Sequence, residues 1–257
     1  WYTKETICRY DAKTGKTAAF VKDGKERTYD LTLKEILGEE NPGKLTGISA
    51  QGGKLAISLD SGKVYILDAA SAAVMKKFDA ANPSDIAFSH DGKLYGIVDG
   101  KVCSINADTG ATTPLPIQGI GKISALAVDN DGNILVADVG PDSQVKAFSA
   151  DGKPVYTCGK KGGRAIRGDF DEQAMLKMSS IAVDAKGQVW VVESWNFPRR
   201  VSVWGKDGKL VRDYLGNTGY AGTGCFLHDQ DPTLGYCGPL EFKLDKQNGT
   251  WKLQKIL

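Results

Sequence analysis

Histidine, concentrated charge and long apolar runs are all scarce in this sequence. It has only two histidines, His90 and His228, which excludes a metal site built from three of them. Its 33 basic and 31 acidic residues leave a net charge of +2, too small an excess for a surface dedicated to nucleic acid or to an anionic membrane. No apolar run approaches the length of a membrane span. We therefore expect neither nucleic-acid binding nor membrane insertion.

Signatures of covalent catalysis and of common cofactor sites are missing as well. No serine lies in a nucleophile elbow. The five cysteines form no CxxC pair and show no zinc-ligand spacing. The run GKKGG at 159–163 lacks the spacing of a phosphate loop. The sequence therefore gives no direct indication of an enzyme, and we expect no cofactor, with calcium as the one cation to consider.

Glycine, by contrast, is abundant at 31 residues, and much of it closes turns between short runs of β-forming residues. The stretch 177–216 predicts four strands in succession, separated by turns such as Ala-Lys-Gly and Lys-Asp-Gly-Lys. One antiparallel meander of this kind cannot cover both of its faces. It needs copies of itself on either side.

Those copies are present. An apolar residue followed by a turn, expected between the third and fourth strands of a repeat, recurs with spacings of 57, 38, 43, 56 and 40 residues, at Tyr10, Leu67, Ile105, Phe148, Trp204 and Leu244. Four strands in a period near 40 residues are typical of a β-propeller blade. We predict an all-β fold: a β-propeller of about six four-stranded blades, forming a single domain over residues 1–257.

The repeats assign approximate boundaries, with an incomplete blade at the N-terminus. That partial blade covers 1–21, and the complete blades cover 45–82, 83–119, 121–159, 177–217 and 218–257. Inserted loops are expected at 22–44 and 159–178, the first with a short amphipathic helix that ends at Gly38. Because one blade lacks strands, we expect this chain to be a segment of a larger polypeptide.

The repeats resemble those of a known family. The blade IAVDAKGQVWVVESWNFPRRVSVWGKDGKLVRDYLG and the segments LAVDNDGNILVAD, QVKAF and ADGKPVYTCG are similar to NHL repeats, and so is the glycine-rich connection before Ile181. The match is good over about 122–216 and looser over 45–115. This resemblance implies a propeller used mostly as a recognition platform, often as one module of a long secreted bacterial protein.

Four carboxylates occupy matching positions at the end of the second strand in four repeats: Asp60, Asp99, Asp138 and Glu193. A ring of oxygen ligands around a channel suits calcium. The alternative is structural, because an acid at this position can accept hydrogen bonds from backbone N–H groups of the following turn. We favour the structural interpretation.

The segment ESWNFPRR departs most from the repeat, because it replaces a short turn with aromatic residues and arginines. Trp195, Phe197, Arg199 and Arg200 suit stacking on a ligand and binding of carboxylates, on a sugar, a cofactor or another protein. The alternative is that the aromatic rings pack over the edge of the blade and the arginines pair with nearby acids.

Weaker candidates lie elsewhere. Arg164 and Arg167 belong to the connection 159–178, which can lean over the mouth of a propeller channel, although a solvated loop is the alternative. His228 and the adjacent Asp229 are the only place where a base might meet carboxylates near the channel. Cys225 and Cys237 fall on neighbouring strands of the last blade, where a disulfide or a pair of packed thiols is possible.

The function expected from the sequence is recognition without catalysis. We expect a scaffolding or binding domain of a larger bacterial protein, outside the cytoplasm, whose partner is a protein, a carbohydrate or another domain of the same polypeptide. The first alternative is an enzyme of the propeller lyase or lactonase sort, with metal held by channel carboxylates. The second is a structural subunit of a cell-surface assembly.

Overall fold

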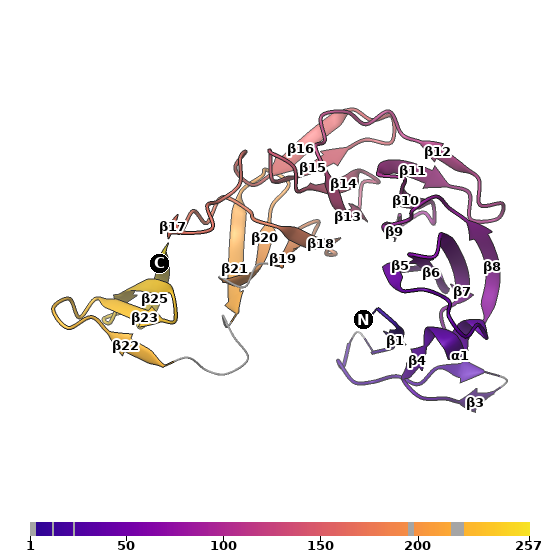
Figure 1. The fold of residues 1–257 in the computed structure, drawn as a ribbon, viewed down its shortest axis with the longest axis horizontal. Helices are drawn as coiled ribbons and strands as arrows, with labels where there is room; N and C mark the ends of the chain where they lie inside the picture. Colours follow the sequence, from indigo (N-terminus) through magenta and orange to yellow (C-terminus); the bar gives the residue numbers. More distant parts are fainter. Residues whose placement is uncertain (1–3, 12, 23, 195–197, 217–223) are drawn as a thin grey trace. The chain divides into compact units, whose positions relative to one another are not determined.

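The computed structural model describes residues 4–11, 13–22, 24–194, 198–216 and 224–257, and the regular secondary structure in these residues is almost entirely β (Figure 1). The strands pair antiparallel into four sheets of four strands and one of five, beside two two-stranded sheets. Meanders of this size are the blades of β-propellers. The predicted all-β, propeller-type architecture is confirmed.

The first three large sheets follow the order of the chain. The first contains β5 (Leu45–Gln51), β6 (Lys54–Leu59), β7 (Lys63–Asp68) and β8 (Val74–Asp79). The second contains β9 (Asp85–Phe88), β10 (Leu94–Val98), β11 (Lys101–Ile105) and β12 (Thr112–Pro114). The third contains β13 (Ile123–Val128), β14 (Ile134–Asp138), β15 (Gln144–Phe148) and β16 (Pro154–Cys158).

The last two large sheets lie in the C-terminal half. One contains β18 (Met178–Val183), β19 (Val189–Glu193), β20 (Arg199–Trp204) and β21 (Leu210–Gly216). The other has the order β17-β25-β24-β23-β22, with β17 (Gly168–Asp169), β22 (Cys225–Leu227), β23 (Leu234–Cys237), β24 (Leu240–Asp245) and β25 (Thr250–Ile256).

The chain divides into two compact units. The first comprises residues 1–119, 123–136 and 148–154, and the second comprises 120–122, 137–147 and 155–257. The sheet β13–β16 contributes strands to both.

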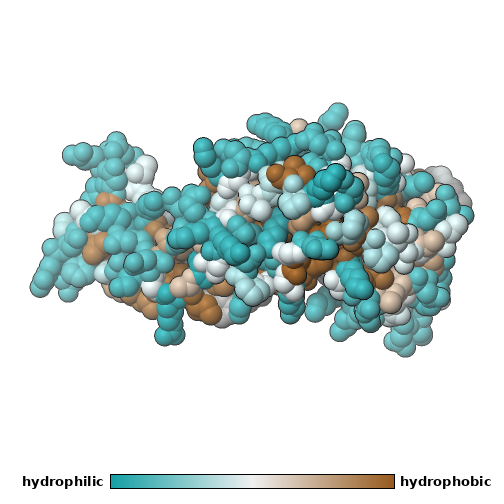
Figure 2. Space-filling view, turned by 90° about the horizontal axis from the view of Figure 1, so that it is seen from above, coloured by the Kyte–Doolittle hydropathy of each residue, from teal (hydrophilic) through white to brown (hydrophobic). Residues whose placement is uncertain are grey.

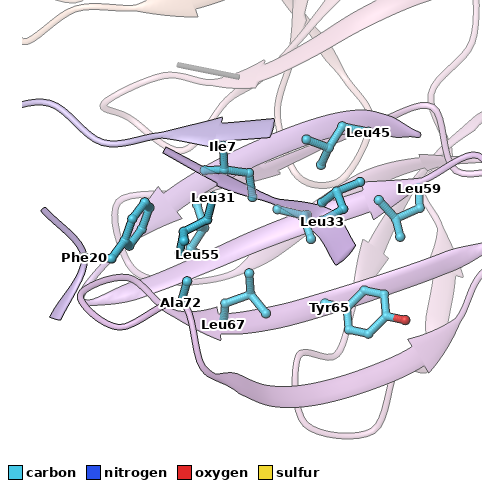
Figure 3. Packing of buried hydrophobic residues seen from close by; sticks show 11 residues of the cluster. Ile7, Phe20, Leu31, Leu33, Leu45, Leu55, Leu59, Tyr65, Leu67 and Ala72 are labelled. Carbon is cyan, nitrogen blue, oxygen red and sulfur yellow. The ribbon is translucent and has the colours of Figure 1, made fainter. Parts of the chain in front are cut away.

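In the first unit, the sheet β5–β8 is buried on both faces because apolar residues occupy both sets of alternating positions. One face carries Leu55, Ile57 and Tyr65 and packs against residues of the N-terminal segment, including Ile7 and Leu31 (Figure 3). The opposite face packs against the sheet β9–β12 through a second cluster: Ala56, Val64, Ile66, Ala80, Ile86, Leu94, Val98, Cys103 and Ile105. Stacking of neighbouring sheets in this way is what the repeat predicts.

The segment 22–44, expected as an inserted loop, is more structured than that. It contains β4 (Asp30–Thr32), which pairs with β1 (Thr6–Cys8), and β3 (Lys25–Glu26), which pairs with β2 (Val21–Lys22). The predicted helix is confirmed as α1 (Leu33–Leu37): Thr32 and Glu35 form a capping box, and Gly38 ends the helix in the left-handed region at φ 67°. Leu33 is buried in the cluster of Figure 3.

In the second unit, part of the expected loop 159–178 joins a sheet. Gly168 and Asp169 form β17, which pairs with Ile256 and Lys255 at the edge of the C-terminal sheet. The cluster that holds this sheet combines residues from the connection, from β21 and from the sheet itself: Phe170, Leu215, Leu240, Phe242, Leu253 and Ile256.

Polar surface predominates on the face shown in Figure 2, where apolar residues gather only in small patches. Within the described residues α1 is the one helix, and it is far too short to cross a membrane.

Candidate recognition site

The carboxylates at the ends of the second strands are engaged by backbone of their own sheets. Asp60 Oδ1 accepts a hydrogen bond from the Lys44 N–H at 2.7 Å, immediately before β5 begins. Asp138 Oδ1 accepts one from the Lys122 N–H at 3.0 Å, immediately before β13. In both cases the acid at the end of the second strand fixes the start of the first strand. The sequence predicted donors in the following turn, and Asp138 has one there as well, the Gly140 N–H.

Asp138 combines this role with a buried ion pair. It also accepts hydrogen bonds from the N–H groups of Gly121 and Gly140, and the Lys146 ammonium donates to its Oδ2 at 2.8 Å. Burial alone would raise the pKa of Asp138, but the hydrogen bonds from Lys146 and from the backbone outweigh it and lower that pKa below the ordinary value. Asp142 shares the Lys146 ammonium at 2.7 Å.

Glu193 lies in a buried cluster of charged side chains. Its Oε2 accepts hydrogen bonds from Arg164 at 2.8 Å and from the Leu176 N–H at 3.1 Å, and its Oε1 accepts one from Arg200 at 3.1 Å. Arg200 also donates to Asp213 Oδ2 at 3.1 Å. The two arginines and two acids balance in charge, so the cluster is an internal support of the blade.

Arg164 and Arg200, which the sequence suggested as ligand-binding residues, therefore have almost no exposed surface. Both guanidinium groups also lie near the ring of Phe170, with centroid distances of 5.4 and 5.5 Å. Arg200 pairs with nearby acids, as the alternative interpretation of its segment expected. Arg164 does not lie in a solvated loop, because it is buried against Glu193, 29 residues away in the sequence. Binding of a ligand by either remains a prediction.

An open groove of about 500 Å³ lies at the end of the sheet β18–β21, where β19 and β21 end and β20 begins. Its lining includes Val192, Val201 and Tyr214, one from each strand. These three are directly opposed across the strands, Val192 with Val201 and Val201 with Tyr214, so they form a continuous row on one face. Trp190 stacks on Tyr214 with ring centroids 6.0 Å apart and extends the apolar surface.

The exposure of Val192 sets this blade apart from its neighbours. Val192 immediately precedes Glu193, and the residues before the matching acids, Leu59, Val98 and Ala137, are 0%, 8% and 0% exposed. Val192 is 39% exposed, and Tyr214 is 48% exposed. The residue at this position is buried in the other three repeats but exposed in this one.

Two arginines give the groove positive charge. Arg199, at the start of β20, is exposed and belongs to the groove lining. Arg212 is exposed on β21, and its Nη1 donates to the Tyr214 hydroxyl at 3.4 Å. The buried arginines add no net charge because Glu193 and Asp213 neutralise them. An apolar floor with guanidinium groups beside it suits an apolar chain that carries carboxylates.

Of the remaining candidates, those that the structure describes are not among the residues that line this groove. Trp195 and Phe197 lie outside the described residues. Arg167 and Asp229 are exposed. His228 caps a turn, where its Nδ1 accepts hydrogen bonds from the Gln230 N–H at 3.1 Å and the Asp231 N–H at 3.0 Å. Whether it also acts as an acid or base is untested.

The metal candidates are dispersed along the repeats. Asp99 accepts a hydrogen bond from the Asn82 side chain at 3.2 Å, and the other three have the backbone and arginine donors described above. Within the ranges that the structure describes, no three His, Cys, Asp or Glu side chains come together in a group that could hold a metal ion.

Sequence reasoning missed Lys146 and Tyr214. Lys146 gave a signal, because it is a lone charge in the apolar run QVKAF, and a buried lysine requires a paired acid. Tyr214 gave none, because nothing local shows which face of β21 stays exposed.

The fold and the groove define an all-β protein of consecutive antiparallel blades of the propeller type. A scan of the sequence against protein-family models finds no matching family, and a search of curated proteins finds no match. One similar solved structure is a protein of unknown function from Bacteroides caccae, 15% identical, with a TM-score of 0.43 over 75% of this chain and 68% of that chain. The fold assignment therefore rests on the sheets themselves.

Proposed function

We propose that this chain is a non-catalytic recognition domain, with NHL-like blades, within a larger extracytoplasmic bacterial protein. Its binding surface is the groove on β19, β20 and β21. The observation that supports this most directly is the row Val192, Val201 and Tyr214, in which Val192 is exposed at a position whose equivalents in three other blades are buried.

The partner that fits is an extended protein segment in which apolar side chains alternate with an acidic one. Its apolar side chains would cover the row, and a carboxylate would reach Arg199 or Arg212. Exposed tyrosine and arginine side chains are also the residues that most often dominate protein-binding energies. Because both arginines are exposed, affinity should fall as salt screens the charge.

The candidate metal ligands and the candidate base do not favour the catalytic alternative. The acids that it would use as metal ligands accept hydrogen bonds from backbone and arginine, and His228 caps a turn. The structural-subunit alternative predicts that the chain purifies only in a complex.

The test uses the full chain and an array of extended peptides with alternating apolar and acidic residues. Binding is measured by fluorescence anisotropy for the wild type and for Val192→Ser/Tyr214→Ser. The matched control, Val155→Ser/Tyr10→Ser, removes a similarly exposed valine and tyrosine elsewhere. We expect the groove variant to lose about tenfold or more in affinity, equivalent to about 1.4 kcal/mol, and the control to bind like the wild type.

Three results would overturn the proposal. These are equal binding by both double variants, binding of glycans in place of peptides, and turnover of lactones or glycuronides that EDTA abolishes. The last result would establish the enzymatic alternative.

A further inference from the structure

Two of the five cysteines face one another in the C-terminal sheet. Cys225 on β22 and Cys237 on β23 are directly opposed in the antiparallel register. All five cysteines lie in described parts of the chain and are present as thiols.

The backbone hydrogen bonds between β22 and β23 show whether Cys225 and Cys237 form a hydrogen-bonded or a non-hydrogen-bonded pair. The His228 N–H donates to the Leu234 carbonyl at 3.1 Å, so His228 and Leu234 form a hydrogen-bonded pair. Hydrogen-bonded and non-hydrogen-bonded pairs alternate along an antiparallel ladder. Three steps further along lies Cys225 with Cys237, which is therefore a non-hydrogen-bonded pair.

At such a pair the Cα atoms approach to about 4.5 Å and the side chains are at their closest, which is within the range that a disulfide spans. The two thiols lie within hydrogen-bonding reach of each other, and this hydrogen bond, together with burial, raises the pKa of Cys225. Their cross-strand neighbours on the same face are Leu240 and Ile256, both buried. Cys225 is exposed, so an oxidant can reach the pair.

The other cysteines have no comparable opposition. Cys8 is opposed to Asp30, and Cys103 lies opposite Gly96 and Pro114. Cys158 is buried, and burial raises the pKa of its thiol to about 12, which suppresses the reactive thiolate. Oxidation should therefore be specific to one pair.

We propose that Cys225 and Cys237 form a cross-strand disulfide when the protein meets a thiol–disulfide oxidant. The thiolate of Cys225 attacks one sulfur of an external disulfide, which releases one thiol and leaves a mixed disulfide. The thiolate of Cys237 then attacks the Cys225 sulfur and releases the second thiol. Two protein thiols are oxidised, the external disulfide is reduced to two thiols, and the protein loses two hydrogen atoms.

The cross-link acts at an edge of the sheet. β22 has three residues, all exposed, and among the described strands it pairs with β23 alone. A covalent bond fixes this edge strand where few hydrogen bonds do so. Such disulfides persist in oxidising compartments, so the pair is a chemical indicator of where the protein resides.

The test starts from the fully reduced full chain, incubated with oxidised glutathione and then alkylated without unfolding. We expect an intact mass lower by two hydrogen atoms than that of the dithiol, with no retained glutathione. Chymotrypsin cleaves after Phe226 and Tyr236, between the two cysteines, so a non-reducing digest should contain a linked peptide pair that reduction separates. In Cys237→Ser, Cys225 should keep a glutathione adduct or be alkylated.

A geometric control retains two thiols on the same two strands. The variant Cys225→Ser/Leu227→Cys places its thiol opposite Gly235, diagonal to Cys237. We expect its linked fraction to be lower by about tenfold or more, since diagonal neighbours lie beyond the reach of a disulfide. Alkylation of both native cysteines after oxidation, or equal linkage in the diagonal variant, would overturn the proposal. The wild-type digest decides the matter even where a variant fails to fold.

Discussion

Glu193 and Arg200 are directly opposed on β19 and β20, and a hydrogen bond of 3.1 Å joins two side chains that have no exposed surface. Arg200 belongs to the segment ESWNFPRR, which the sequence suggests for contact with a ligand, yet its side chain lies inside the blade. The neighbouring Arg199 remains on the surface. Two consecutive arginines thus have different roles, because successive residues of a strand point to opposite faces.

Replacement of Glu193 should therefore destabilise the second unit strongly. Glu193→Gln keeps the shape of the side chain but leaves the charges of Arg164 and Arg200 buried without their shared acid. We expect a loss of about 3–5 kcal/mol in the free energy of unfolding, measured by denaturant titration. Asp213→Asn is the control, because Asp213 is partly exposed and water can replace it. Equal losses in the two variants would contradict this account.

The buried lysine gives a second matched comparison. Lys146→Met removes the ammonium that neutralises Asp138, and we expect it to cost about 1–3 kcal/mol, because Asp138 keeps its backbone donors. Lys161→Met removes an exposed ammonium 3.3 Å from Asp142 and should change stability very little. Thermal unfolding of both variants checks this prediction, and a stable Lys146→Met would refute it.

The buried carboxyl of Asp85 should give the stability of the protein an unusual dependence on pH. Burial raises the pKa of this carboxyl to about 6, although the N–H groups of Leu126 and Ile86 donate to it at 2.8 Å. Between about pH 4 and pH 6 the folded protein keeps this proton while the unfolded chain loses it, so the contribution of Asp85 to stability falls as pH rises through that window. The effect is at most about 3 kcal/mol.

The measurement compares the wild type with Asp85→Asn by urea unfolding at about pH 4.5 and about pH 7. Because the variant has no titrating carboxyl at this position, the wild type should gain stability relative to it at the lower pH. Parallel pH profiles for the two proteins would show that the folded-state pKa of Asp85 is ordinary.

Gly47 lies where β5 closely approaches β9, the first strand of the next sheet. A Cβ atom at this position would lie 2.7 Å from the Asp85 backbone, so β5 and β9 cannot keep their separation around an alanine. We expect Gly47→Ala to cost about 1–3 kcal/mol. Gly224→Ala, whose Cβ would meet open space, is the control. If Gly47→Ala had the same free energy of unfolding as the wild type, the two strands could move apart without a loss of stability.

The strands and the helix could be predicted because their signals are local. Thr32 and Glu35 form the capping box of α1, and Gly38 supplies the left-handed residue that ends it. The turn residues that follow Leu67 and Ile105 end the third strands of their sheets as expected. Each of these signals acts within a few residues, so pattern alone identifies it.

The candidate site could be predicted only in part, because its determinants are not local. Arg164 and Glu193 are separated by 29 residues, and nothing in either segment names the other as its partner. The expected donors of Asp138 lay in the next turn, where Gly140 donates, but the N–H groups of Gly121 and Lys122, just before the first strand, donate to it as well. Burial of Arg200 and exposure of Val192 both depend on what packs against the sheet, and a single sequence does not show that.

Hydrogen–deuterium exchange on the full chain, with and without the tightest-binding peptide from the array, tests the central claim most directly. We expect slower exchange in peptides that contain the ends of β19 and β21 and the start of β20, with little change in the sheet β5–β8. Protection confined to other sheets, with the groove strands unchanged, would contradict it.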